Sequence, residues 1–422
     1  MPAYRNPIAA NRIPALPRDG YGGTAQTVLP DASYAAGVEH YLAASRRDHV
    51  KIHWEEPASH RVIRKAMRDV GKEQGLRVLD VGSGTGDGLA LFASVRPDES
   101  AACGGDLLAR YLGIDCSPQM VATARELHGT APNVSFQMGD VRESIPGDPF
   151  DIYFSSGVPY SHLTENDLET CLYQIFHAIR RNRNQAAIVI DVLGRYSIEW
   201  VRHWEDRRWQ YRMSFFVSDQ QVDHTPMTVY GASDLQAVIL GAARSADIRI
   251  RGIEYLDRSI LVGRHSATLE FNPGIPPYRT LVNALARADG SVAFQDMLFN
   301  PESLPGPSHV RCFFGSFAKC WNTLVAEAAD AAGDPIGVPA AALPAEVTGL
   351  GADIARRLDE TGSRHRRAVA QFFLERYLRR LGQCMQPGLG VGHTLIAVTA
   401  ADGAGRFADS FVPPIGASSA CF

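Results

Sequence analysis

The sequence predicts an α/β fold built on a doubly wound, mostly parallel β-sheet. An apolar run at 78–81 leads directly into glycines at 82, 84 and 86, and then into a helix-compatible run at 89–93. Later apolar runs also end in an acid or a glycine, and stretches with helical periodicity separate them. Alternating strands and helices of this kind are typical of a parallel sheet with helices on both faces.

The glycine turn after residue 81 predicts a nucleotide-type site. Glycine permits positive φ and lets a ligand approach bare backbone, and the helix that follows directs its free N–H groups at that ligand. A dinucleotide fingerprint needs Gly-x-Gly-x-x-Gly. Here the glycines alternate and Asp87 follows them, an acid that would repel a pyrophosphate. A Walker loop is excluded because no Gly-Lys-Ser/Thr follows.

The following segments repeat the strand and helix alternation. Ser117 and Pro118 predict the start of a helix over 119–127, with Ser117 as the N-cap and Pro118 at the first helical position. Thr164 is the expected N-cap of another helix over 166–181. Further strands are expected at 111–115, 134–141, 150–157 and 186–191.

This series resembles the class I S-adenosylmethionine-dependent methyltransferases of the small-molecule type, over roughly residues 60–265. The apolar run, the acid and Gly-x-Gly-x-Gly at 78–86 are similar to motif I of that family, and the later strands resemble its later motifs. The resemblance implies a Rossmann-like class I fold, an enzyme, and S-adenosyl-L-methionine as its cofactor. The cofactor-binding residues it implies are Asp80, Gly82, Ser83, Gly84, Gly86, Asp115, Cys116, Met120, Asp140, Val141 and Ser156.

Each part of the cofactor has an expected position. Its amino-acid end is expected near Asp80 and Gly82, the ribose on Asp115, and the adenine against Asp140 and Val141. A strand-terminal Asp such as Asp115 is also a common helix N-cap, so this residue alone has two interpretations.

The run 156–163 follows the fourth strand, where ligands bind in doubly wound sheets. It resembles the small-residue, aromatic, His-Leu pattern of methyltransferases that act on small amines and acids. His162 is the candidate base or a structural histidine that braces the loop. Tyr160 either holds the nucleophile by its hydroxyl or walls the pocket.

Arginines and aromatic residues alternate after the fifth strand, with three of the five tryptophans between 200 and 209. Guanidinium groups pair with carboxylates and rings cover apolar surface, so Arg195, Tyr196 and Arg212 are expected to touch the substrate. The other interpretation is an amphipathic helix with its rings in the core. Tyr34, in the N-terminal segment, is a further candidate to face the substrate or the sulfonium.

The end of the sheet is expected to hold a return strand at 227–230 and a helix at 232–243. Two last strands are expected at 248–255 and 259–264, joined by a tight turn at 256–258. The family's final strand usually runs antiparallel.

The expected elements divide the chain into three regions. Residues 1–60 are expected to form an arm and a helical cap, 61–265 the cofactor-binding domain, and 266–422 a mostly helical extension. In the extension, helices are expected near 313–332 and 351–381, and a strand at 395–399. The extension is expected to serve in dimerisation, as a lid over the substrate, or in partner binding.

Composition limits the function. A net charge of −4 gives no basic footprint for nucleic acid, and no segment is apolar enough to predict a membrane span. Seven scattered cysteines fit reduced thiols in the cytoplasm and argue against a structural metal. We therefore expect O- or N-methyl transfer to an amino-acid-like or aromatic metabolite. C-methyl transfer, another use of the same cofactor and a non-catalytic partner subunit are the alternatives.

Overall fold

The computed structural model describes residues 47–95, 107–212, 224–267, 274–362 and 365–408. Within them, five parallel strands lie side by side in the order β3, β2, β1, β4 and β5. Their bounds are β1 Leu76–Val81, β2 Leu108–Asp115, β3 Val134–Met138, β4 Ile152–Phe154 and β5 Gln185–Gly194. The predicted α/β fold with a mostly parallel sheet is confirmed.

The sheet continues beyond β5 through a strand from the far end of the chain. Strand β9 (Thr394–Asp402) runs antiparallel to β5 along its length, and β8 (Arg249–Arg258) runs antiparallel to β9. Strand β7 (His224–Tyr230) pairs only with the last two residues of β5 and forms a hairpin with β6 (Arg208–Arg212). Segment 208–212, where an amphipathic helix was one interpretation, is therefore a strand.

The predicted pair of last strands is wrong in part. The chain does not turn at 256–258, because β8 continues to Arg258. Ser259 and Leu261 then take positive φ, which ends the strand before the expected second one. The antiparallel partner of β8 is β9, which includes the strand expected at 395–399. Residues 266–422 therefore supply a strand of the central sheet as well as helices.

Helices cover both faces of the sheet because its strands are apolar on both sides. Leu76 and Val78 of β1 pack toward α2 and α3, whereas Leu79 and Val81 pack toward α5. The helices on the two faces are α2 Glu56–Val70, α3 Asp87–Ser94, α4 Pro118–His128, α5 Glu165–Asn182 and α6 Ala232–Ser245. Both predicted caps are present: Ser117 accepts from the Met120 N–H, and Thr164 forms a capping box.

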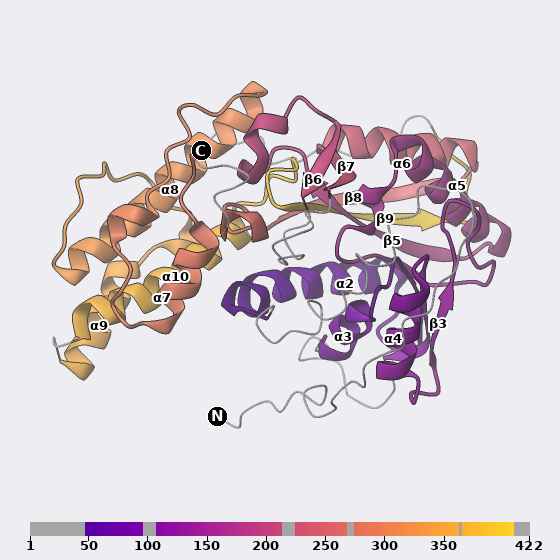
Figure 1. The fold of residues 1–422 in the computed structure, drawn as a ribbon, viewed down its shortest axis with the longest axis horizontal. Coiled ribbons are helices and arrows are strands. Elements are labelled where there is room, and N and C mark those ends of the chain that lie inside the picture. Colours follow the sequence, from indigo (N-terminus) through magenta and orange to yellow (C-terminus); the bar gives the residue numbers. More distant parts are fainter. Residues whose placement is uncertain (1–46, 96–106, 213–223, 268–273, 363–364, 409–422) are drawn as a thin grey trace.

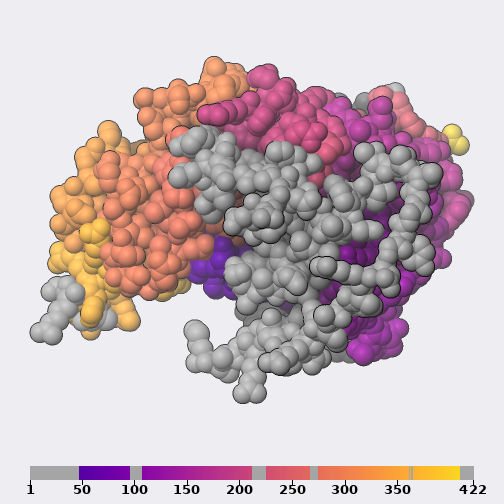
Figure 2. All heavy atoms as spheres, in the orientation of Figure 1, coloured from indigo at the N-terminus to yellow at the C-terminus, as the bar shows by residue number. Residues whose placement is uncertain are grey.

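A helical layer lies between β8 and β9 in the sequence and at one end of the molecule in space (Figures 1 and 2). Its helices pack on an apolar core that includes Tyr278, Phe314 and Trp321 and that also receives Trp200 and Trp204. They are α7 Tyr278–Arg287, α8 Ser308–Ala332, α9 Leu350–Thr361 and α10 Arg366–Cys384. The sequence indicates α8 but merges α9 with α10, and it misses α7.

Short helices connect these elements. A five-residue π-helical turn, η3, precedes α2, and 3-10 turns follow β4, β5 and β8 and flank α8. Their bounds are η3 Lys51–Glu55, η4 Pro159–His162, η5 Ile198–His203, η6 Arg264–Ala267, η7 Phe294–Met297 and η8 Ala345–Val347.

Candidate functional site

The glycine turn after β1 is anchored to the neighbouring strand. The N–H groups of Gly82 and Ser83 both donate to the Ile114 carbonyl, at 2.9 and 3.0 Å. Gly82, Gly84 and Gly86 have φ of 68°, 52° and 96°. A Cβ on Gly82 would lie 2.3 Å from the Cβ of Pro159, whereas a Cβ on Gly84 would have no heavy atom of the described residues within 4 Å. The turn is therefore fixed on one side and open beside Gly84.

Asp115, at the end of β2, is held over this turn. Its two carboxylate oxygens accept from the N–H groups of Gly84 and Ser117, each at 2.9 Å. Burial raises the pKa of Asp115, against the lowering effect of these donors. A carboxylate has about four acceptor positions, so Asp115 keeps capacity for further donors.

Asp80 lies beneath the same turn and is 1% exposed. The Tyr111 hydroxyl donates to its Oδ2, while its Oδ1 has no partner among the described residues. Burial raises the pKa of Asp80 to about 7. The Ser83 Oγ is also buried without a described partner. Two buried oxygens at the turn thus remain available to a polar ligand.

The other residues expected to bind the cofactor, including Asp140 and Val141 at the adenine, lie after β2 and β3. Arg142 pairs with both carboxylate oxygens of Asp140 and holds its pKa below the usual value. Val141 is half-buried, and Met120 is 3% exposed. Cys116 is exposed. A ligand at Asp140 would therefore have to share the carboxylate with Arg142.

The loop after β4 passes over the turn. Ser156 is half-buried in it, and Gly157 and Val158 both have positive φ. The Gly157 N–H donates to the Asp191 carboxylate of β5 at 3.1 Å. The loop is therefore tied to the carboxyl half of β5.

The two residues expected to do chemistry are not brought together at an open site. Tyr160 is fully buried in the apolar core beside Leu79 and Val81, and its hydroxyl has no described partner. Burial and the nearby Arg208 guanidinium lower the pKa of His162 to about 4, and its Nδ1 is buried without a described partner. At neutral pH His162 is uncharged and a weak base.

The expected substrate residues have mixed positions. Arg195 donates to the Trp204 carbonyl at 2.7 Å and pairs with Asp234 at 3.2 Å, and it lies over the Tyr196 ring. The Tyr196 ring also meets Trp204 edge to face. Arg212 belongs to β6, but its side chain lies outside the described residues, as does all of Tyr34. Arg195 is thus engaged in holding the segment after β5.

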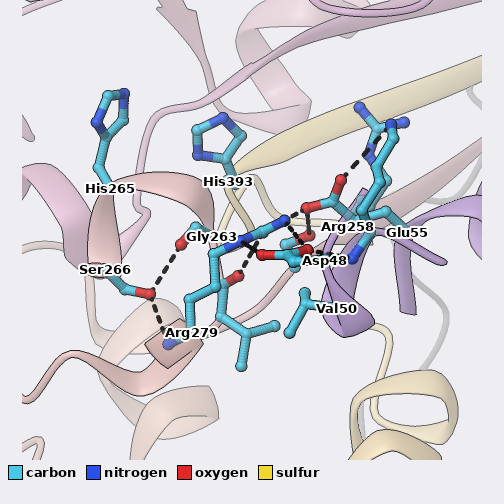
Figure 3. A network of polar contacts seen from close by, with 12 residues as sticks. Asp48, Val50, Glu55, Arg258, Gly263, His265, Ser266, Arg279 and His393 are labelled. Atoms are coloured by element: carbon cyan, nitrogen blue, oxygen red, sulfur yellow. Dashed lines mark hydrogen bonds and ion pairs between the residues drawn. The ribbon is translucent and has the colours of Figure 1, made fainter. Parts of the chain in front are cut away.

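A buried charge cluster beyond the carboxyl edge of the sheet was not predicted (Figure 3). The Arg279 guanidinium of α7 pairs with both oxygens of Asp48 at 2.8 Å and with Glu55 at 2.7 Å. Nearby, Arg258 pairs with Asp191 at 2.8 Å and donates to the Ser59 hydroxyl. This cluster joins η3, α2, the sheet and the helical layer.

A second buried group contains two histidines. Glu199, which is 1% exposed, accepts from Nδ1 of His393 at 2.6 Å and from the backbone N–H groups of His265 and Ser266. Tyr211 bonds to Nε2 of His265. The only sequence signal for this group is that His393 stands between a glycine-rich stretch and the expected strand at 395–399.

The described part of the chain holds neither a metal-type cluster of side chains nor an apolar helix of membrane length. It holds no group of three or more His, Cys, Asp or Glu side chains that could bind a metal ion. None of the helices in the described ranges combines the length and the apolar character needed to cross a bilayer.

Comparison with known proteins agrees with this fold. Residues 78–182, about a quarter of the chain, match the family model of a methyltransferase domain. No curated protein matches the chain.

Several solved structures are similar to the chain at low identity. An S-adenosylmethionine-dependent methyltransferase from Mesorhizobium loti is 16% identical over 46% of this chain and 83% of its own, with a TM-score of 0.33. One from Clostridium acetobutylicum is 13% identical over 53% of this chain and 91% of its own, with a TM-score of 0.36. A TehB-like S-adenosylmethionine-dependent methyltransferase from Corynebacterium glutamicum is 18% identical over 53% and 85%, with a TM-score of 0.31.

The family match covers β1 to α5, the segment that carries the glycine turn and the acids after it. Residues 78–182 therefore match a methyltransferase domain, and the mostly parallel sheet to which they belong has the class I methyltransferase fold.

Proposed function

We propose that this protein transfers a methyl group from S-adenosylmethionine to an O or N atom of a small metabolite, amino-acid-like or aromatic, in a biosynthetic pathway. The observation that carries the proposal is the turn after β1. It combines three glycines of positive φ, open space beside Gly84, and the buried orphan oxygens of Asp80 and Ser83. A ligand with both an amine and hydroxyl groups fits this donor and acceptor set.

The residues proposed to hold the cofactor are those that the sequence motifs imply. Asp80 and the backbone at Gly82 would take its amino-acid end, Asp115 its ribose hydroxyls, and Asp140 with Val141 its adenine. Ser83, Gly84, Gly86, Cys116 and Met120 would complete the walls, and Ser156 would lie toward the acceptor. When bound, the sulfonium supplies an activated methyl group. The contribution of the protein is to position the acceptor, which can supply several kcal/mol.

The proposed acceptor side of the site is the loop 156–158 at the carboxyl edge of β5. The loop 156–158 is tied to Asp191, and Asp191 is tied through Arg258 to α2. A layer of helices over the carboxyl edge favours an acceptor small enough to be enclosed, which supports the small-molecule proposal. Arg195 and Tyr196 remain proposed substrate contacts from the segment after β5, and Arg212 and Tyr34 are retained from the sequence.

The proposal is tested with purified protein, S-adenosylmethionine labelled in its methyl group, and a metabolite extract. We expect a labelled product whose mass exceeds that of an extract component by one methyl group. Titration calorimetry should show binding of the cofactor and of its demethylated product but not of NADH. Tight NADH binding with no heat from the other two would overturn the proposal.

The same experiment separates the alternatives. A product that gains more than a methyl group would indicate transfer of another part of the cofactor. A methyl group on carbon, located by NMR, would indicate C-methyl transfer. Cofactor binding without any product in the extract would favour a non-catalytic partner subunit.

We further propose a cytoplasmic protein that acts without nucleic acid or membrane and that dimerises through the helical layer. The acidic net charge and scattered cysteines support the first part. Light scattering coupled to size exclusion tests the second, since a monomer would give a mass of 46.0 kDa.

A further inference from the structure

We infer that His393, oriented by Glu199, is the general base that removes the proton from the methyl acceptor. The inference rests on the proposed function and adds to it a catalytic residue and the class of acceptor. It assigns the base to a residue 231 positions after His162, in the segment just before β9.

Each oxygen of the Glu199 carboxylate accepts two hydrogen bonds. Its Oε1 accepts from the backbone N–H groups of His265 and Ser266, the latter at 2.9 Å. Its Oε2 accepts from the Ser197 hydroxyl at 3.1 Å and from Nδ1 of His393 at 2.6 Å. Burial alone would raise the pKa of Glu199, but the neighbouring His393 and these donors together hold it below the usual value.

This environment fixes the tautomer of His393. An ionised carboxylate only accepts hydrogen bonds, so Nδ1 of the neutral ring must carry the proton and Nε2 must keep its lone pair. The described residues give Nε2 no hydrogen-bond partner, and the side chain is 17% exposed. A base that is oriented on one side and open on the other is the arrangement that proton abstraction needs.

The position of His393 places it at the acceptor side. Its carbonyl accepts from the Gly194 N–H at 3.1 Å, at the end of β5, and its own N–H donates to the Ser259 carbonyl. Asp191, which holds the Gly157 loop, is three residues earlier on the same strand. Three residues of a strand span about 10 Å. The backbone of His393 therefore lies at the same carboxyl edge of β5 as the point where the loop 156–158 is tied, about 10 Å further along the strand.

Of the two neighbouring histidines, His393 and His265, we assign the role of base to His393. Among the described residues, the titratable groups in contact with its ring are Glu199 and His265, whose ring centroid lies 5.8 Å away. Burial lowers the pKa of His265 to about 3, so His265 stays uncharged at neutral pH. The Trp200 ring also lies against His393, at 5.5 Å, and offers an apolar wall.

The chemistry of a histidine base selects the acceptor. A phenolic hydroxyl has a pKa of about 10, within about 4 units of histidine, whereas an aliphatic alcohol is close to water at about 15.7. We therefore assign a phenol-type hydroxyl. Its proton passes to Nε2 of His393 and its oxygen bonds to the methyl carbon. The carbon–sulfur bond breaks with its electron pair left on sulfur, which becomes a neutral thioether.

The first test is spectroscopic and needs no acceptor. Long-range ¹H–¹⁵N spectra of the full chain, with His393 assigned by comparison with His393→Gln, should show the Nδ1–H tautomer near neutral pH. Glu199→Gln should convert it to a mixture of tautomers. An Nε2–H tautomer in the unsubstituted protein would overturn the inference.

The second test is kinetic and uses the labelled cofactor with a whole metabolite extract, whose labelled products are identified by mass spectrometry. His393→Gln and His393→Asn should lower kcat at least 100-fold, with cofactor affinity unchanged within twofold and native circular dichroism. His177→Gln, on the exposed face of α5, is the control and should keep full turnover. Glu199→Gln should lower kcat less and shift the acid limb of the pH profile.

The outcomes separate the two claims. No labelled product from the unsubstituted protein would reject the proposed function. A product formed at an undiminished rate by both His393 variants would reject the inference alone. A labelled amine in place of a phenol would reject the acceptor class.

Discussion

Gly82 shows how one residue fixes the shape of the cofactor turn. Its φ of 68° belongs to the left-handed region, and the Pro159 side chain occupies the space that a Cβ would take. Gly84 has a similar φ but open surroundings. Substituting each glycine with alanine therefore distinguishes the cost of a strained backbone conformation from the cost of a steric clash.

We predict that Gly82→Ala lowers the free energy of unfolding by about 2–4 kcal/mol, through conformational strain and the contact with Pro159. It should also weaken cofactor binding, because the turn must move. Gly84→Ala is the matched control and should cost about 1–2 kcal/mol from conformation alone. Urea denaturation and calorimetry measure the two effects, and equal losses in both variants would contradict the role given to Pro159.

Asp80 makes the cofactor-free protein sensitive to pH. Burial raises its pKa to about 7 in the folded state, above about 3.9 in the unfolded chain. Between these values the folded state holds the proton more tightly, so stability falls as pH rises from about 4 to 7.

Asp80→Asn should remove this dependence. Relative to the unsubstituted protein, the variant should gain stability as pH rises from 4 to 7 and keep that gain above pH 7. Three pKa units set an upper limit of about 4 kcal/mol. Denaturation curves at several pH values measure the difference, and parallel curves for the two proteins would reject the assignment.

At the scale of elements, Asp257 connects β8 to the loop that precedes β9. Its Oδ2 accepts from the Leu389 N–H at 2.8 Å, and its Oδ1 accepts from the N–H groups of Gly390, Val391 and Gly392. The glycines of this loop have no room for side chains, since a Cβ on Gly390 or Gly392 would meet backbone atoms within 2.5 Å. The loop therefore has one packed arrangement, and that arrangement positions His393.

Asp257→Asn should loosen this loop. Asn replaces one carboxylate oxygen with an NH₂ group. This group cannot accept a hydrogen bond from the backbone N–H that the missing oxygen bound. Loss of one or more charged hydrogen bonds should cost about 2–3 kcal/mol. Hydrogen exchange of amides 389–392 should accelerate, whereas the exposed Asp289→Asn should leave it unchanged. Unchanged protection in Asp257→Asn would contradict the role of this carboxylate.

At the scale of the whole molecule, the helical layer is bound to the sheet by buried charge as well as by apolar packing. Arg279 of α7 is 3% exposed and pairs with Asp48 and Glu55, which precede α2. The partners of these ion pairs are far apart in sequence: Asp48 lies 231 residues and Glu55 lies 224 residues before Arg279. Removing the guanidinium would leave two acids without their partner.

We predict that Arg279→Ala lowers the free energy of unfolding by about 3–5 kcal/mol, the usual cost of breaking a buried pair. Arg287→Ala, at the exposed end of the same helix, should change it by less than about 0.5 kcal/mol. Chemical denaturation compares the two variants. Similar small losses in both would mean that apolar packing alone holds the layer.

The position of β9 leads to a prediction about chain length. A chain that ends at residue 265, the boundary that the sequence favours, would lack β9 and leave β5 and β8 without their shared partner. Because both strands would expose unpaired edges, we expect it to be insoluble or to lack a cooperative thermal transition. A chain ending at 408 should keep both, and a cooperative transition in the shorter chain would contradict the role of β9.

The sequence by itself determined the part of the protein proposed to bind the cofactor, strands β1 to β5 and the helices between them. Apolar runs that end in glycines or acids predict β1 to β5, because a buried parallel strand and its following helix leave a local signal. Ser117 and Thr164 predict helix starts for the same reason, since a cap bonds only to its own turn. The cofactor acids Asp80, Asp115 and Asp140 were placed from this pattern and stay a proposal.

Only the tertiary structure decided the part of the protein proposed to hold the methyl acceptor. The pairing of β9 with β5 and β8, and the meeting of Glu199 with His393, join residues about 135–220 positions apart. Neither leaves a periodic signal, because such contacts depend on how a whole layer of helices folds back over the sheet. The same packing buried Tyr160 and the ring of His162, which the sequence had placed at the site.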